Sequence, residues 1–389
     1  MAALAGKRIG LLTARASRTN GGVFEAVVRQ VDLLKTLDAQ PVVVAAEDDS
    51  HAADAWRLAG AEIRLAQIHG PKHPGFAPRL TPVLLDAGLD LVHLHGIWSY
   101  ASRAATRWSK ATNGPLVISP LGMCDAWMIE RNRWKKNLAR LAWEKSAWSN
   151  AMAFHALTPA EAGDIGRECG AQLIGVIPSC ASPPSQPRQT MPPPMVLYLG
   201  TIHEKKNLVA LMEGWLAALP DLPPDASLVV AGWGDEEGVT ALERFLEPMG
   251  PSIEFVSAAF ASQKAALLEL ARFLVLPSSS EGLPISILDG WSAGIPAAIS
   301  PACNLPEGYA NGAALKCGPD RESIKTALIE ALRIEEPEWL SMSRAAQALA
   351  SGTFGKEHIA GQWRRIYEDC LGVLSPAQLE RQISGKIPQ

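Results

Sequence analysis

A proline-rich stretch between two series of strand-length apolar segments constrains the fold of this chain more than any other feature of its sequence. It occupies residues 179–194, with the letters SCASPPSQPRQTMPPP. Proline has no backbone N–H and fixes φ, so this stretch can sustain neither a helix nor a central strand. On both sides of it, short apolar runs alternate with helical patterns, as in βαβ units whose parallel sheets are buried on both faces. The sequence therefore predicts two α/β domains joined by a linker.

The apolar runs also predict where the strands lie. In the first series we expect strands near residues 8–14, 40–46, 62–66, 89–95, 115–120, 151–157 and 173–178, and in the second near 195–200, 227–232, 252–256, 272–277, 296–300 and 312–317. This gives a Rossmann-like domain at 1–180, a linker at 181–194, a second Rossmann-like domain with two closing helices at 195–371, and a polar tail at 372–389. Parallel sheets bind ligands outside the carboxyl ends of their strands, so two such domains facing each other predict an interdomain cleft.

Composition excludes several functional classes. The chain has 36 Lys and Arg residues against 40 Asp and Glu residues, so it lacks the basic field that non-specific nucleic-acid binding needs. Its six cysteines form no C-x-x-C pair, which predicts neither a zinc site nor a disulfide framework and fits a reducing cytosol. No apolar run reaches the ~20 residues that span a bilayer, and no signal-peptide segment is recognisable. We expect a cytoplasmic protein, either soluble or attached peripherally to the membrane face.

Three strand-to-helix connections carry residues suited to binding an anion or a sugar. In LLTARASRTNGGVFEAV, Gly21 and Gly22 stand directly before a helix, where glycine permits close backbone approach and the helix N-terminus offers free N–H groups. The alternative is a tight connection without a ligand. In VLYLGTIHEKKNLVALMEGW, Lys205 and Lys206 stand between a strand and a helix, where their charge would attract phosphate. The alternative is two solvated lysines.

The third connection holds two carboxylates eight positions apart. The segment LVLPSSSEGLPISILDGWSAGIPAAIS places Glu281 at a helix entry and Asp289 about two turns later. Carboxylates bind pairs of sugar hydroxyls, while the glycine and proline between them leave backbone N–H groups for a phosphate. Alternatively, Glu281 caps the helix and Asp289 is an ordinary surface residue.

These segments together resemble a known family. The chain is similar, from residue 8 to about residue 367, to the retaining GT-B glycosyltransferases of family 4, especially those that build capsule, exopolysaccharide or O-antigen units. The family's E-x7-E signature is met by Glu281 and Asp289. The other matching blocks are LGTIHEKKN (199–207), AGWGDEEG (231–238) and LPSSSEGLP in the second domain, and TNGGVFEAV (19–27), DLVHLHGIWSY (90–100), ISPLGMCDAW (118–127), HALTPAEAGDI (155–165) and GVIPS (175–179) in the first.

The resemblance implies a nucleotide-diphospho-sugar donor on the second domain, a glycan or lipid-linked glycan acceptor, and no metal, since the chain has no D-x-D signature. By the same match, the donor site consists of Gly21, Gly22, Lys205, Lys206, Glu281, Gly282, Leu283, Pro284 and Asp289. Glu281 would bind the donor sugar, Asp289 the ribose and Lys206 the diphosphate. The glycine pair would approach the phosphate from the other side. Glu281, Lys206 and His95 are the catalytic candidates.

Several departures from the family pattern qualify this expectation. Thr201 stands where the family has an arginine, a loss for which Lys205 or Lys206 could compensate. Asp289 is one methylene shorter than the family's glutamate. Leu121 replaces a histidine near the reacting end of the donor, which makes His95, at the end of a strand, a candidate replacement. The alternative for His95 is a hydrogen-bonded core histidine.

These departures leave two other functions open. A catalytically silent glycosyltransferase-like subunit would explain Thr201, Leu121 and Asp289 together. A GT-B nucleotide-sugar epimerase would use the same donor groove. Slow donor hydrolysis by the purified protein would count against the silent subunit, and product analysis with and without an acceptor separates the epimerase from a transferase.

The stretch 131–148, RNRWKKNLARLAWEKSAW, suggests contact with the inner membrane surface. At helical spacing Trp134, Leu138, Leu141 and Trp148 share one side, with basic residues including Lys136 roughly opposite, and such helices lie in lipid interfaces. The alternative is a helix that packs this apolar stripe into the core.

Overall fold

The structure is a computed structural model that describes residues 4–69, 75–234, 240, 242, 250–256 and 262–372. Its internal contacts divide the chain into two compact units. The first unit comprises Met1–Ser179 and Glu357–Gln389, and the second comprises Cys180–Lys356.

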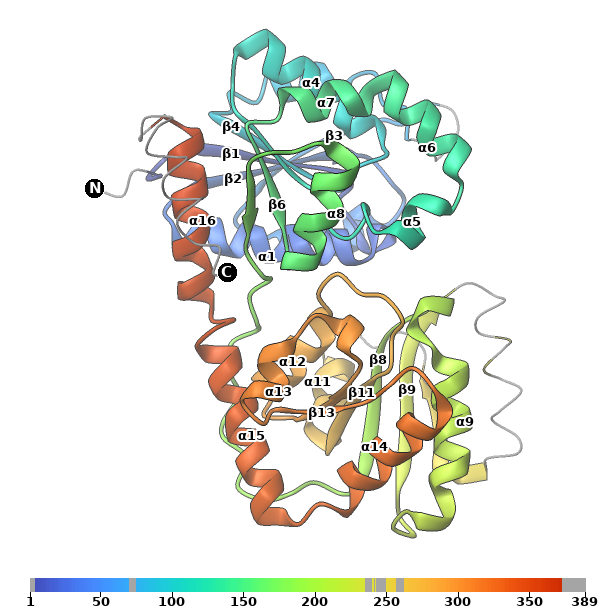
Figure 1. The fold of residues 1–389 in the computed structure, drawn as a ribbon. Helices are drawn as coiled ribbons and strands as arrows, with labels where there is room; N and C mark the ends of the chain where they lie inside the picture. Colours follow the sequence, from blue (N-terminus) through green and yellow to red (C-terminus); the bar gives the residue numbers. More distant parts are fainter. Residues whose placement is uncertain are drawn as a thin grey trace. The chain divides into compact units, whose positions relative to one another are not determined.

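The sheet of the first unit is entirely parallel in its described part, with the strand order β3-β2-β1-β4-β5-β6-β7 (Figure 1). Its strands are β1 (Arg8–Arg15), β2 (Gln40–Ala46), β3 (Glu62–Ala66), β4 (Leu91–His95), β5 (Leu116–Ser119), β6 (Ala153–Ala156) and β7 (Ile174–Val176). Every residue of β4, β5 and β6 is buried, so these strands are mainly apolar, and their polar residues are the buried His93, His95, Ser119 and His155.

Helices cover both faces of this sheet. They are α1 (Gly22–Thr36), α2 (His51–Asp54), α3 (Leu80–Leu85), α4 (Tyr100–Thr112), α5 (Ala126–Glu130), α6 (Arg133–Ala139), α7 (Lys145–Asn150), α8 (Pro159–Cys169) and α16 (Lys356–Cys370), with a π-helical turn at Arg140–Glu144. Local sequence sets their ends: α8 begins with the Thr158 hydroxyl accepting the Glu161 N–H at 3.2 Å and ends at Gly170 in the left-handed region. Helices α3, α4 and α7 pack together over a core that includes Leu94 and Trp108.

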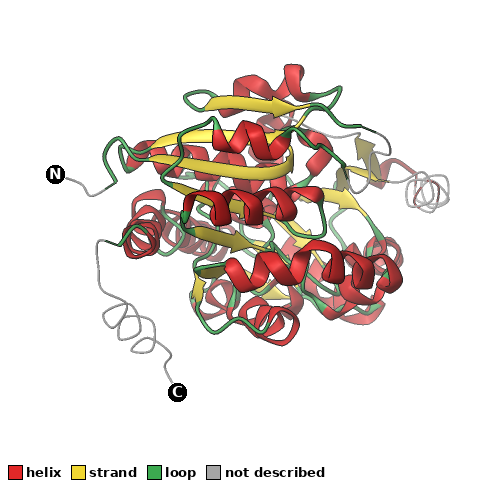
Figure 2. Cartoon of the chain, turned by 90° about the horizontal axis from the view of Figure 1, so that it is seen from above, coloured by secondary structure: helices red, strands yellow, loops and turns green. Residues whose placement is uncertain are grey.

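The second unit repeats the pattern with the described strand order β10-β9-β8-β11-β12-β13, again parallel throughout. Its strands are β8 (Met195–Ile202), β9 (Ser227–Gly234), β10 (Ile253–Val256), β11 (Phe273–Leu276), β12 (Ala297–Ile299) and β13 (Ala314–Lys316), and its helices are α9 (Leu208–Ala218), α11 (Ser262–Leu270), α12 (Ile285–Ser292), α13 (Pro306–Ala310), α14 (Arg321–Arg333) and α15 (Glu336–Ser351). Helices α9 and α14 pack against each other, as do α12 and α15. Figure 2 shows the helices (red) lying over the strands (yellow). The expected two α/β domains are thus confirmed.

The last helix corrects the expected domain boundary. The sequence analysis placed residues up to 371 in the second domain, whereas α16 packs on the first sheet (Figure 1). Its Trp363 and Tyr367 rings lie 4.9 and 5.9 Å from the His93 ring on β4. The helical pattern predicts which face of α16 is buried, but it does not say which sheet covers that face.

The proline-rich stretch is also more ordered than a free linker. Ser182 donates to Asp289 at 2.6 Å, and the Arg188 guanidinium donates to the carbonyls of Leu268 and Ala293 at 2.8 and 3.1 Å. Residues 180–194 therefore lie along the second unit. Among the described residues, no helix has the length and apolar composition needed to cross a membrane.

Each sheet reverses its strand order at one point. In the first unit this happens between β1 and β4, and in the second between β8 and β11. Ligands of doubly wound sheets bind at such switch points, outside the carboxyl ends of the strands. The loops after β1, β4, β8 and β11 are therefore the places to examine.

Candidate functional site

The loops after β8 and β11 bring the two catalytic candidates of the second unit, Lys206 and Glu281, together. The Lys206 ammonium donates to Glu281 Oε1, forming an ion pair whose side chains are only 12% and 6% exposed. Ser278 Oγ donates to the same oxygen at 2.7 Å. A nearly buried ion pair between two loop residues implies that the surrounding fold holds both side chains in place.

Two asparagines that the sequence analysis did not single out hold these loops. Asn304 donates its amide to the carbonyls of Glu281 and Gly282 at 2.7 and 3.1 Å. Asn207, at φ 59°, ends the short 3₁₀ turn of Lys205 and Lys206 and donates to the Pro277 carbonyl at 3.3 Å. Asparagine tolerates the left-handed conformation, and an asparagine directly before a helix is the signal that could have identified Asn207.

The loop after β11 also fixes Lys205 and the predicted sugar-binding backbone. The Ser279 N–H donates to the Lys205 carbonyl at 2.8 Å, which ties this loop to the one after β8. Helix α12 begins after Pro284, and no side chain caps it. Glu281 is therefore not an N-cap, which rules out that alternative. The segment Gly282, Leu283 and Pro284 lies between the carboxylate and the helix.

Asp289 is buried on α12, so it is not the surface residue of the alternative interpretation. Ser182 donates to its Oδ1 at 2.6 Å, and Lys264 on α11 forms an ion pair with its Oδ2 at 2.5 Å. Both partners were missed by the sequence analysis, because one lies in the proline-rich stretch and the other on a helix distant in sequence.

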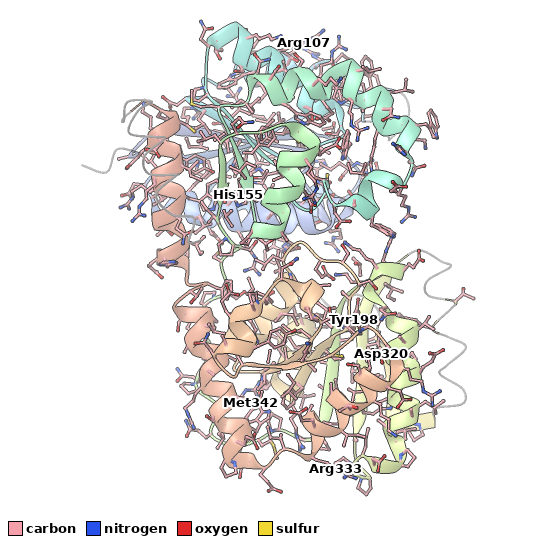
Figure 3. The ribbon with its side chains drawn as sticks, viewed as in Figure 1. Arg107, His155, Tyr198, Asp320, Arg333 and Met342 are labelled. Atoms are coloured by element: carbon pink, nitrogen blue, oxygen red, sulfur yellow. The ribbon has the colours of Figure 1, made fainter. Side chains whose placement is uncertain are left out.

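Glu281 also influences the hydroxyl of Tyr198 on β8. Burial, and then the negative charge of Glu281, raises the pKa of Tyr198 well above its ordinary value. The phenol therefore stays protonated and donates to the carbonyl of Thr201 at 2.7 Å, which fixes the strand end before the lysines. Figure 3 labels Tyr198 in the second unit and His155 in the first.

In the first unit, the Gly21-Gly22 turn lies where the sequence predicts it, between β1 and α1. Gly21 has φ 55° and ψ −134°, a conformation that strains any residue with a side chain. Among the described residues, none would lie within 4 Å of a Cβ at Gly22, and no side chain caps α1. The first N–H groups of this 15-residue helix are thus approachable, which fits the predicted phosphate contact.

His95 is a buried residue of β4. Its Nδ1 lies 3.2 Å from the carbonyl of His93, and burial lowers its pKa to about 3. It is therefore neutral at physiological pH, and its burial and hydrogen bond are those of a core histidine. Leu121, in the position where the family has a histidine, has φ 57°, a conformation rarely adopted by leucine. The catalytic role of His95 remains a prediction.

A directional chain of hydrogen bonds surrounds His93. His155 Nε2 must donate to the Ile177 carbonyl at 2.7 Å, so its Nδ1 accepts from Ser119 at 2.7 Å. Ser119 then accepts from His93 Nε2 at 2.6 Å, and His93 Nδ1 accepts from Tyr367 at 2.8 Å. Burial lowers the pKa of His93 well below its ordinary value and that of His155 to about 4. These hydrogen bonds attach α16 to the sheet, and His93 and His155 are both neutral.

The stretch 131–148 is divided between the surface and the core. Trp134, Leu138 and Leu141 are 64%, 59% and 75% exposed, whereas Trp148 is 8% exposed and packs in the core. The expected placement of Trp148 with the other three is wrong. The π-helical turn Arg140–Glu144 has more residues per turn than an α-helix, so it rotates the following residues to another side.

The described part of the chain contains no cluster of metal-ligating side chains. No group of three or more His, Cys, Asp and Glu side chains there could hold a metal ion. The expected independence from metal remains a prediction.

Comparisons with known proteins identify families for both units. Residues 21–179 match the glycosyl transferase 4-like domain, and residues 193–333 match the glycosyl transferases group 1. The GDP-mannose:cellobiosyl-diphosphopolyprenol alpha-mannosyltransferase of Xanthomonas oryzae pv. oryzae is 24% identical over 373 residues, which cover 91% of this chain and 94% of that protein.

Solved structures share the fold at low sequence identity. Anabaena Alr3699/HepE, in complex with UDP and glucose, superposes with a TM-score of 0.74 at 16% identity over 93% of this chain and 100% of the other. WaaG, a glycosyltransferase involved in lipopolysaccharide biosynthesis, superposes with a TM-score of 0.66 at 14% identity over 92% and 99%.

Proposed function

This chain belongs to the glycosyltransferases of family 4 and has their GT-B fold, and on that premise we propose that it transfers a sugar from a nucleotide-diphospho-sugar to a glycan or lipid-linked glycan. The observation that carries the proposal is the Lys206–Glu281 ion pair at the switch point of the second sheet. A diphosphate needs a fixed cation and a sugar needs a fixed carboxylate, and here one loop pair supplies both.

When the donor binds, each member of this ion pair takes a group of the donor as its new partner. Lys206 turns from Glu281 to the diphosphate, and Glu281 accepts a hydrogen bond from a sugar hydroxyl. The diphosphate gains negative charge as the glycosidic bond breaks, so a positioned ammonium stabilises the transition state more than the ground state. Lys205 and the backbone of Gly282, Leu283 and Pro284 lie on the same two loops. Asp289 contacts the ribose.

We propose that transfer retains the anomeric configuration and that GDP-mannose is the first donor to test. The full-length relative acts on GDP-mannose and forms an alpha-mannoside. GDP-mannose carries its sugar in the α configuration, so an α product means retention. The acceptor would be an intermediate of surface polysaccharide synthesis, such as an exopolysaccharide unit.

The direct test combines donor binding with product analysis. The purified chain is screened by thermal shift against nucleoside diphosphates and nucleotide sugars, because a ligand at ~100 times its Kd stabilises by ~2.7 kcal/mol. The preferred donor is then incubated with and without acceptor, and the anomeric configuration of the product is read by NMR. Donor hydrolysis or transfer supports an active enzyme, whereas donor binding without either supports a silent subunit. Epimerised donor without acceptor supports an epimerase.

Variants link this activity to the proposed residues. Glu281→Ala should bind nucleoside diphosphate and slow transfer by roughly 10–150-fold, since the lost charge-assisted hydrogen bond is worth ~1.5–3 kcal/mol. Glu322→Gln on α14, whose side chain is 74% exposed, is the matched control. Unchanged turnover in Glu281→Ala contradicts the donor assignment.

We also propose that the reaction needs no metal, because Lys206 provides the positive charge. Activity should survive EDTA in full. Loss of activity that magnesium or manganese restores would show that a metal neutralises the diphosphate instead.

Membrane attachment completes the proposal. Trp134, Leu138 and Leu141 form an exposed apolar surface, and the exposed cations Arg133 and Lys135 flank Trp134. Aromatic and aliphatic side chains enter the lipid interface, and each cation near an anionic surface adds ~1 kcal/mol. This arrangement suits a peripheral enzyme on the cytoplasmic membrane face.

Liposome flotation tests this attachment. The wild type should bind vesicles of phosphatidylcholine with 30% phosphatidylglycerol, taken as roughly the anionic fraction of a bacterial membrane, and high salt should weaken binding. Changing Trp134, Leu138 and Leu141 to Ser should abolish binding, whereas Leu270→Ser, at a 54% exposed leucine of the second unit, should not. A wild type that ignores the vesicles at low salt refutes membrane attachment.

A further inference from the structure

The loop after β4 holds a tryptophan in an unusual conformation. Trp98 has φ 67°, a region that bulky side chains almost never occupy. Its loop lies at the switch point of the first sheet, where β1 and β4 are neighbours. Strained residues that persist at such places are held by their surroundings and often belong to a binding site.

A buried carboxylate holds the backbone of this loop. Glu144, which is fully buried, accepts the Trp98 N–H through Oε1 at 2.6 Å. The same oxygen accepts from Ser102 Oγ at 2.9 Å and from Trp143 Nε1 at 3.1 Å. Among the described residues, Oε2 of Glu144 is buried without a hydrogen-bond partner. Oε1 thus accepts from the loop backbone at Trp98 and from the side chains of Ser102 and Trp143.

Glu144 lies in the π-helical turn Arg140–Glu144. Such turns inside helices often mark functional sites, because they place side chains that a regular helix could not. Here the turn aims one residue inward at the Trp98 backbone while Leu141 stays on the surface.

The indole of Trp98 is fixed as well, and cations lie over it. Its Nε1 donates to the Met123 carbonyl at 3.1 Å, and its ring meets Trp148 edge-on with the centroids 5.8 Å apart. Lys136 Nζ lies 5.8 Å and Arg140 Cζ 5.3 Å from the ring centroid. Cations at such distances are attracted to the ring face.

Positive charge accumulates at this ring. Arg140 pairs with Glu168 at 2.5 Å, and Lys136 donates to the neutral carbonyl of Met128. Burial, and then the charge of Arg140, lowers the pKa of Lys136. Within the described part of the chain, Glu168 is the carboxylate that pairs with one of these two cations, an arrangement that favours an added anion.

An aromatic ring beside two cations, of which only Arg140 is paired with a carboxylate among the described residues, is suited to binding a phosphorylated sugar. Sugar rings pack their C–H faces on indoles, and phosphate oxygens accept from ammonium and guanidinium groups. The helix that supplies Lys136 also carries Trp134 and Leu138 on its exposed side. A lipid-linked diphosphate held at a membrane would reach this helix first.

We propose that Trp98, Lys136 and Arg140 form the acceptor site of this enzyme, which takes the diphosphate and first sugar of a lipid-linked acceptor. Glu144 is the positioning residue that holds Trp98 in place. The proposal rests on the proposed glycosyl transfer, yet it makes a binding prediction of its own.

Binding of farnesyl diphosphate tests the site without requiring turnover. Calorimetry on the full chain saturated with GDP, or with whichever nucleoside diphosphate binds best, keeps the donor site filled. The wild type should bind farnesyl diphosphate, and Lys136→Gln should weaken binding at least tenfold. Lys145→Gln, at an exposed lysine outside both this site and the proposed membrane surface, should change it less than twofold. Absence of binding in the wild type, or equal effects of both variants, overturns the proposal. Competition by the nucleotide also overturns it, because the diphosphate would then occupy the donor site.

Kinetics distinguish this proposal from the proposed function. With Lys136→Gln, the KM for a diphosphate-linked acceptor should rise at least tenfold, while the KM for the donor and for the same glycan as an alkyl glycoside stay unchanged. A rise for both acceptors contradicts recognition of the diphosphate. Failure of the wild type to use any donor contradicts the proposed function and leaves the calorimetric result to decide on the site.

Glu144 is tested by conservative rescue. Glu144→Ala should raise the KM of the diphosphate-linked acceptor with little change in donor KM, and Glu144→Gln should restore it, because the amide oxygen still accepts the Trp98 N–H. If Glu144→Ala does not fold, Trp98→Phe, which keeps an aromatic ring but loses the bond to Met123, should give the same selective rise. An unchanged acceptor KM in the folded variants assigns both residues to stability alone.

Discussion

Glu144→Gln should make the protein less sensitive to pH. Burial raises the pKa of Glu144 from its ordinary value of 4.5 to about 7, against the opposing effect of its hydrogen bonds. The folded state therefore holds a proton on this carboxyl between about pH 4.5 and pH 7 that the unfolded state has lost. The stability that this proton provides is complete below pH 4.5 and is lost as the pH rises through 7.

The size of the effect follows from the two pKa values. A tenfold change in an ionisation constant is ~1.4 kcal/mol, so the whole linkage is about 3 kcal/mol. Most of it, roughly 2–3 kcal/mol, is lost between pH 5 and pH 8.5. Glutamine cannot titrate and keeps the shape of the side chain. The free energy of unfolding of the wild type should therefore fall relative to that of Glu144→Gln by roughly this amount across that range.

Urea unfolding at pH 5, 6, 7 and 8.5 measures this difference. Other titrating groups, including His93 and His155, are common to both proteins, so their contributions cancel in the difference. Glu144 lies in the first unit, so where the two units give separate transitions, only that of the first unit should respond to the substitution. Parallel pH profiles for the two proteins would refute a raised pKa. A wild type that gains stability over the variant as pH rises would show that the hydrogen bonds outweigh the burial.

Three further predictions concern the candidate site. Gly21→Ala should lower stability by about 1–3 kcal/mol in thermal or urea unfolding because of its left-handed backbone, whereas Gly22→Ala, with open space at its Cβ, should not; equal effects would contradict the strained geometry. Lys206→Ala should weaken nucleoside diphosphate binding in calorimetry more than nucleoside binding, and equal losses would point to a wrong site. His95→Ala should lower the thermal midpoint and reduce kcat less than tenfold, because the imidazole is buried and neutral; a loss of ~10²–10⁴-fold at unchanged stability would instead identify it as the catalytic replacement for Leu121.

The sequence alone determined the strands, the two-domain organisation and the family. Strands buried on both faces are mainly apolar, so β4 and β5 could be predicted from their apolar residues, although each also carries a buried polar residue such as His93 or Ser119. The positions of Gly21, Lys206 and Glu281 at strand ends also follow from the chain, because parallel strands present their carboxyl ends at one edge.

The tertiary structure decided which groups meet. It paired Lys206 with Glu281 across 75 residues and Lys264 with Asp289, and it packed α16 on the first sheet through Tyr367. It also divided the stretch 131–148, with Trp134 in solvent and Trp148 in the core. Periodicity gives the direction of a side chain relative to its own helix. What that side chain meets depends on packing between distant segments, and a single π-helical turn is enough to change it.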